Sequence, residues 1–271
     1  MKKEQLEGSN IFFQNEYTLE KNIIENNYEN ILNLIFELWE FNRPAKIDIY
    51  IMKSDFKFAI MTHSIVQKLL LITFYLPFWI LFERETRKKW RAVSHFQRKY
   101  PIILLKPIEA YDRLDKSIGK HIFIDAKIYK KKDQFLITLC DQLVNICIPP
   151  KIPIWINEGI STFTVENFIK KPKYKNESIL LLKNDCKMIK NVHELSKVSD
   201  TCIAYNYAKG YWTVRYLEEN YPGFLKETFM KYEGEEIVER IRLKLGLSEE
   251  DFWEQLDELL YENYKHLLDN Q

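Results

Sequence analysis

The stretch TLCDQLVNICIPPKIPIWINEGISTF, residues 138–163, joins two segments in which apolar residues recur at helical spacing. The earlier segment extends back to about residue 132 and stops before Pro149 and Pro150, because proline cannot continue a helix. The later segment runs from residue 153 to residue 170. This part of the chain therefore predicts two consecutive helices joined by a short turn that contains proline.

Upstream of these helices, the pattern predicts strands mixed with helices. The segment KIDIYIM, residues 46–52, alternates apolar and polar side chains so that Ile47, Ile49 and Ile51 share one face, as in a half-buried strand. Before it, residues 18–41 follow helical spacing. Further strands are predicted at residues 10–14, 100–106 and 120–126, and further helices in the apolar run 69–82 and the basic run 83–100.

Downstream, the pattern is helical to the end of the chain. The last helix is preceded by Ser248 with Asp251 three residues later, a relative of the capping box. Strands first and helices later predict an α+β fold of two lobes, one at residues 1–150 and a mostly helical one at residues 151–271. The predicted helices of this second part, after residue 170, are residues 207–221, 223–232, 235–245 and 248–268.

Composition excludes some classes of protein. Hydrophobic residues make up 46% of the 271 positions, enough for a sizeable core, and a net charge of +1 lacks the footprint of a nucleic-acid binder. Two lysines near the start precede no apolar stretch, so we expect a cytoplasmic location, where disulfides are not expected. No C-x-x-C pair occurs, which predicts buried thiols rather than a zinc knuckle at Cys140, Cys147, Cys186 and Cys202.

The longest apolar run, residues 69–82, is too short to cross a membrane, which takes about 20 apolar residues. Pro77 would also interrupt a helix at its middle. We expect a helix in the core or between lobes. The alternative is a peripheral membrane contact, helped by the basic run that follows and made by side chains such as Phe78 and Trp79.

The segment PIWINEGIS, residues 153–161, resembles the P-x-W-[IL]-x-E-G-[IL]-[AS] segment of the gluzincins, the thermolysin-like zinc peptidases, and especially of their "peptidase MA-like" members. In such peptidases an H-E-x-x-H helix supplies two zinc ligands and a general base, and a following helix supplies a glutamate as the third ligand. The resemblance extends over most of the chain outside about residues 62–115, which look like an inserted or diverged stretch. It implies a two-lobed thermolysin-like fold.

Placing Glu158 at the third-ligand position aligns the segment DQLVN with H-E-x-x-H. The resemblance then puts Asp141 and Asn145 at the two histidine positions and Gln142 at the general base. A glutamine has no carboxylate to accept a proton, and the ligand positions offer oxygen only, which suits hard cations better than zinc. We therefore expect no zinc and no cofactor, with a weak hard-cation site as an alternative.

The same resemblance suggests a peptide-binding cleft that outlasts the lost chemistry. Its expected partner is a peptide or protein segment, held against a strand edge as in active relatives. Trp155, Asn157 and Tyr205 are the cleft candidates, and either Tyr205 or Tyr207 matches the position of an oxyanion-stabilising residue. The function predicted is that of a pseudopeptidase.

Two alternatives remain open at this point. One is an enzyme with altered chemistry, based on the oxygen-rich positions or on Cys140 beside Asp141. The other is a membrane-peripheral interaction module built on residues 69–91.

Overall fold

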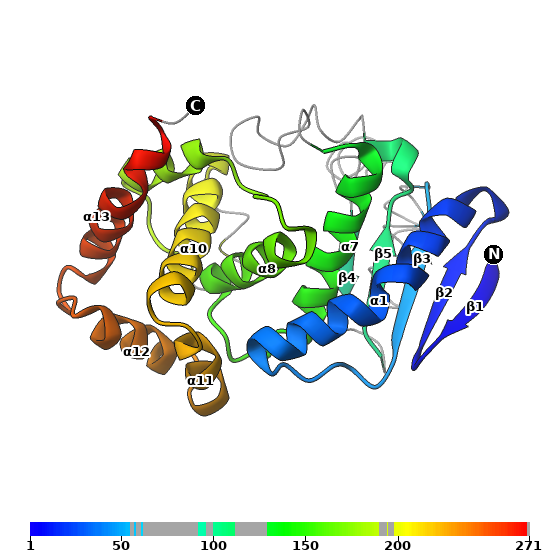
Figure 1. The fold of residues 1–271 in the computed structure, drawn as a ribbon, viewed down its shortest axis with the longest axis horizontal. Helices are drawn as coiled ribbons and strands as arrows, with labels where there is room; N and C mark the ends of the chain where they lie inside the picture. Colours follow the sequence, from blue (N-terminus) through cyan, green and yellow to red (C-terminus); the bar gives the residue numbers. More distant parts are fainter. Residues whose placement is uncertain are drawn as a thin grey trace, which may run out of the picture. The chain divides into compact units, whose positions relative to one another are not determined.

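The described part of the chain has a mixed α+β fold, as the order of predicted strands and helices indicated (Figure 1). It divides into two compact units, the first of which holds the described residues of Met1–Leu32, Arg43–Lys120 and Ala126–Ile146. The second unit holds Asn33–Asn42 and the described residues from Cys147 onward. The boundary expected from the sequence was residue 150. The computed structural model describes residues 1–54, 57, 61, 92–95, 100–111, 129–189, 194 and 198–269.

A five-stranded sheet forms the centre of the first unit. Its order is β1-β2-β3-β5-β4, with the three middle strands parallel to one another and each outer strand antiparallel to its neighbour. All four residues of β5 are buried, and β3 alternates buried and half-buried residues as its sequence predicted. The strands are β1 (Lys2–Leu6), β2 (Ser9–Phe13), β3 (Ile47–Ile51), β4 (Ala92–His95) and β5 (Ile102–Leu105).

The three middle strands confirm the sequence prediction, but the two outer strands were not anticipated. The first, β1, consists mostly of exposed polar residues and carries no apolar alternation; it pairs with β2 through a turn in which Gly8 has a φ of 68°. The basic run was predicted to be helical, and for Ala92–His95 that prediction is wrong. Pairing with β5 outweighs the local helical pattern there.

Both β4 and β5 fall within residues 62–115, so part of this stretch belongs to the sheet. The strand predicted at residues 120–126 and the apolar run 69–82 lie outside the described residues. No helix in the part of the chain that the structure describes is long and apolar enough to cross a membrane.

Helices follow the predicted positions closely. Helix α1 (Thr18–Trp39) belongs to the first unit through Leu32, and α7 (Lys131–Cys147) ends at the first residue of the second unit. The second unit contains α8 (Ile154–Ile169), α10 (Asp200–Asn220), which begins earlier than predicted, α11 (Phe224–Lys231), α12 (Glu235–Leu245) and α13 (Phe252–Tyr264). Short 3-10 segments are η1 (Asn15–Tyr17), η3 (Ile108–Ala110), η4 (Asn176–Lys183) and η5 (Lys265–Leu267).

Helices α8 and α10 lie side by side in the second unit and cross where each carries a glycine (Figure 1). A Cβ atom placed on Gly159 would lie 2.2 Å from the carbonyl oxygen of Gly210, and one on Gly210 would lie 1.9 Å from the carbonyl oxygen of Trp155. Backbone atoms cannot move aside as a side chain can. Only glycine at both positions permits this close approach of the two helices.

We therefore predict that Gly159→Ala and Gly210→Ala each destabilise the fold by about 3 kcal/mol or more, because the helices must separate. Urea unfolding followed by tryptophan fluorescence measures the change. Gly246→Ala is the matched control, since a Cβ atom at this position would meet nothing within 4 Å. Its φ of 69° alone should lower the free energy of unfolding, by about 1 kcal/mol. Equal losses for all three variants would contradict the proposed steric contact.

Candidate functional site

The DQLVN segment lies in the second half of α7, in the first unit. Leu143 and Val144 are completely buried, whereas Asp141, Gln142 and Asn145 are half-buried. Residues three and four positions apart are neighbours on one side of a helix, and Asn145 lies three positions after Gln142 and four after Asp141, so the three polar side chains gather around one partly accessible face of α7. This face carries the residues that the resemblance aligned with two ligands and a base.

Glu158 is half-buried on α8, in the second unit. Asp141 and Asn145, which the resemblance assigns to the same ligand set, belong to the first unit. These three side chains offer oxygen only, and one is a neutral amide, whereas zinc prefers nitrogen and sulfur ligands. Among the residues described, no three His, Cys, Asp or Glu side chains gather as a metal site would require.

The four cysteines differ from expectation. Cys140 and Cys147 are buried thiols, as predicted. The expectation of no disulfide is wrong, because Cys186 and Cys202 are bonded, with their Cα atoms 5.4 Å apart. The two cysteines are sixteen positions apart in the sequence. Cys186 follows η4 and Cys202 lies in the first turn of α10, and the fold brings these two segments together. Complete burial of Cys140 disfavours it as a nucleophile, since reactive thiols are partly exposed.

Two cavities lie within the second unit, and the cleft candidates line them. The tryptophan pocket, of about 770 Å³, is lined by Trp155, Asn157 and Trp253, by apolar residues of the turn before α8, and by Val238 of α12. Charged side chains also line it, namely Lys151, Glu235, Glu239, Arg242 and Glu249. The acidic pocket, of about 730 Å³, is lined by Tyr205 and by four carboxylates, namely Asp185, Glu254, Asp257 and Glu258. Met188 and Trp253 line both cavities, so the pockets adjoin.

Tyr205, one of the two oxyanion candidates, has a structural partner. Its hydroxyl group donates to Asp257 Oδ2 over 2.6 Å, and the same oxygen lies 2.9 Å from the Lys209 ammonium group. Lys209 is fully buried and also donates to the carbonyl of Trp253. The other candidate, Tyr207, is half-buried on the same helix.

This Tyr205–Asp257–Lys209 cluster has perturbed ionisation. Burial lowers the pKa of Lys209, with Asp257 opposing the change. Burial likewise raises the pKa of Asp257, and the charge of Glu254 adds to that rise while Lys209 and Tyr205 oppose it. Sequence analysis did not predict Lys209 or Asp257 as members of a cluster. A usable signal for Lys209 was its place on one helix face with two aromatic residues, four positions after Tyr205 and three before Trp212.

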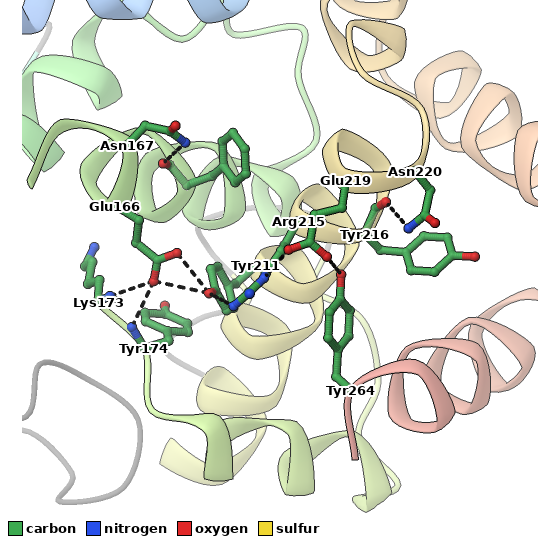
Figure 2. A network of polar contacts seen from close by, with 11 residues as sticks. Glu166, Asn167, Lys173, Tyr174, Tyr211, Arg215, Tyr216, Glu219, Asn220 and Tyr264 are labelled. Atoms are coloured by element: carbon green, nitrogen blue, oxygen red, sulfur yellow. Dashed lines mark hydrogen bonds and ion pairs between the residues drawn. The ribbon is translucent and has the colours of Figure 1, made fainter. Parts of the chain in front are cut away.

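A second buried network ties α8 to α10 (Figure 2). Glu166 accepts hydrogen bonds from the backbone amides of Lys173 and Tyr174, at 2.6 and 3.3 Å, and from the Tyr211 hydroxyl at 3.0 Å. Arg215 donates to the Tyr211 oxygen and to Glu219, which also accepts from the Tyr264 hydroxyl. Donors thus surround the Glu166 carboxylate, whose role is to hold the helices together.

Thiol titration tests the cysteine arrangement. We predict that the folded, unreduced protein reacts slowly with a thiol reagent at every cysteine, because two thiols are buried and two sulfur atoms are bonded. Denaturation without reductant should expose two reactive thiols, and denaturation with reductant all four. Rapid labelling of Cys140 in the folded state would instead revive the hypothesis of a cysteine-based enzyme.

Replacing Tyr211 with phenylalanine tests the Glu166 network. The change leaves Glu166 and Arg215 each without one buried partner, so we predict a loss of about 1–3 kcal/mol in the free energy of unfolding. Tyr261→Phe, on the half-buried face of α13, is the control and should change little. A loss no larger than that of the control would mean that the network adds nothing to stability.

Glu166 also gives a prediction for pH. Burial raises its pKa above 4.5, the ordinary value, with hydrogen bonds from Lys173 and Tyr211 opposing the rise. The folded state therefore binds this proton more tightly than the unfolded state, and stability from this group falls as pH rises from 4.5 through the folded pKa. Glu166→Gln should flatten the stability profile over that window, measured by urea unfolding at a series of pH values; an unchanged slope would contradict the assignment.

Comparisons with protein-family models, with curated proteins and with solved structures found no match to this chain. The resemblance to gluzincins therefore rests on the residues themselves, chiefly the segment around Glu158 and the helix that carries DQLVN.

Proposed function

We propose that this chain is a gluzincin-like pseudopeptidase, which binds a peptide or protein segment without hydrolysing it. The observation that supports the proposal is the partly accessible polar face of α7, which carries Asp141, Gln142 and Asn145, the residues that the resemblance aligns with two zinc ligands and a general base. Leu143 and Val144 remain buried, so the segment keeps its packing. Only the three polar positions of DQLVN depart from the H-E-x-x-H motif.

Hydrolysis by a gluzincin needs a metal-bound water and a carboxylate that takes its proton. Gln142 offers an amide, which cannot accept a proton at neutral pH, and Asn145 offers a neutral oxygen where the motif has an imidazole. Within DQLVN, no residue can perform either step. Recognition of an extended peptide by strand pairing needs neither metal nor base, so binding is the activity that such a chain can retain.

The arrangement of elements supports a thermolysin-like two-lobed fold as part of the proposal. The chain runs from a mixed sheet into α7 and then directly into α8, the order in which gluzincins carry their two ligand helices. At one end of the described sheet, β4 is antiparallel to β5 and provides an edge at which an extended segment could add.

A cytoplasmic location is also part of the proposal, and it conflicts with one observation. Cytosolic thiols are kept reduced, whereas Cys186 and Cys202 form a disulfide. Cell fractionation combined with thiol trapping decides the matter. A bonded pair recovered from the cytosolic fraction would support the location, and recovery outside that fraction would exclude it.

Restoring the lost ligands tests the proposal. We predict that the triple variant Asp141→His, Gln142→Glu and Asn145→His binds one zinc ion per chain, while the natural protein binds none, as measured by elemental mass spectrometry after purification without a metal-affinity step. Adding Glu158→Gln to the triple variant should weaken zinc binding at least tenfold. Glu166→Gln added in the same way is the matched control on the same helix and should leave zinc binding unchanged.

Two results would contradict the proposal. Stoichiometric zinc in the natural protein would show that other residues bind the metal and that chemistry remains possible. Failure of a folded triple variant to bind zinc would show that DQLVN and Glu158 do not correspond to the ligand positions of a gluzincin site.

A further inference from the structure

The acidic pocket and the tryptophan pocket form one continuous surface within the second unit, because Met188 and Trp253 line both. The two halves differ in character. The tryptophan pocket is mainly apolar, with Trp155 and Trp253 meeting edge to face at 5.3 Å between ring centroids and Phe252 beside them. The acidic pocket combines aromatic rings with charge. A ligand that spans both must therefore carry two kinds of group.

Charge in the acidic pocket favours a cation. Four carboxylates line it against two lysines, Lys183 and Lys187. Asp257 is paired with Lys209, but within the described residues no basic side chain forms an ion pair with Asp185, Glu254 or Glu258. These three are exposed, so a positive group entering the pocket would meet negative charge that the folded chain has not neutralised.

Asp257 adds an unused acceptor to this pocket. Its Oδ2 atom serves both Tyr205 and Lys209, whereas its Oδ1 atom is buried and accepts no hydrogen bond from any described residue. Leaving a buried carboxylate oxygen unpaired costs free energy, which a donor from a ligand would recover once a movement of the Asp257 side chain exposed that oxygen to the pocket. Guanidinium and ammonium groups are such donors.

The aromatic walls of the acidic pocket also suit a cation. Lys183 Nζ lies 4.1 Å from the ring centroid of Tyr261, and Lys209 Nζ lies 4.6 and 5.2 Å from those of Tyr205 and Trp253. Each of these rings therefore already stabilises a positive charge of the protein itself. Lys183 is exposed, so an incoming cation could displace it.

The segment that forms the shared wall is fixed in place. The disulfide joins Cys186 to α10, and the buried Asn206 side chain accepts from the Ile189 amide at 2.8 Å and donates to the Lys187 carbonyl at 3.2 Å. A wall held on both sides of Met188 requires little ordering when a ligand binds, which favours affinity.

We propose that this surface binds a peptide segment in which a basic side chain enters the acidic pocket and a nearby apolar side chain enters the tryptophan pocket. The inference rests on the proposed function, since it names the kind of segment that the pseudopeptidase would take. It places recognition on α12, α13 and the Cys186–Ile189 wall, and it uses no residue of DQLVN.

Fluorescence anisotropy with short labelled peptides tests the inference. The probes carry one arginine and one phenylalanine separated by one to four alanines; matched probes replace arginine with citrulline, its neutral isostere, or phenylalanine with alanine. We expect one spacing to bind best, to lose about tenfold in affinity with citrulline, and to weaken as salt rises. Replacing phenylalanine should weaken it as well.

Protein variants locate the bound peptide. Glu254→Gln together with Glu258→Gln should weaken the arginine peptide about tenfold and leave the citrulline peptide unchanged. Glu262→Gln, an exposed carboxylate on the same helix outside the pocket, is the matched control and should have no effect. Val238→Glu, in the tryptophan pocket, should weaken the phenylalanine peptide more than its alanine counterpart.

Equal affinity for the arginine and citrulline peptides would overturn the inference, as would binding of spermidine when no peptide binds, which would assign the pocket to a small polyamine. The zinc test separates this inference from the proposed function. Zinc uptake by the triple variant without arginine-peptide binding would refute only the pocket assignment. Peptide binding at the acidic pocket without zinc uptake would refute only the relationship to gluzincins.

Discussion

The close contact of α8 with α10 is the constraint on which the second unit depends. Gly159 and Gly210 bring the two helix backbones together at the crossing. The Tyr211 hydroxyl reaches Glu166 only because the backbones are this close (Figure 2). One residue before Gly210, the same helix buries Lys209, whose charge Asp257 of α13 balances. Packing and electrostatics therefore share one short segment of α10.

Charge in this unit is distributed in two ways. Lys209 is buried and Glu166 is half-buried, and both are surrounded by partners, so they act inside the fold. Asp185, Glu254 and Glu258 are exposed around a cavity whose aromatic walls favour positive charge. The first two groups hold the helices together, and the exposed carboxylates give the pocket surface a negative charge. Neither arrangement uses a residue of DQLVN, so neither depends on the chemistry of α7.

Most of the regular structure could be predicted from the sequence, and the exceptions have physical causes. Local periodicity predicted strand β3, in which the buried Ile47 and Ile49 share one face, and it predicted the helices as well. The outer strands β1 and β4 did not, because pairing with a neighbour rather than local pattern makes them strands. Trp155 and Asn157 were found from their position before Glu158, whereas Asp257 reaches Tyr205 from 52 residues away and had no local signal.

The position of Gly210 has a consequence for how this chain can change in length. Each residue of an α-helix turns the following residues by about 100°. Inserting or deleting one residue early in α10 would swing Gly210 out of the crossing and present a side chain to the Trp155 carbonyl, while moving Lys209 away from Asp257. Related chains should therefore keep the spacing from the Cys202 end of α10 to Gly210 constant, even where the identities of the intervening residues differ.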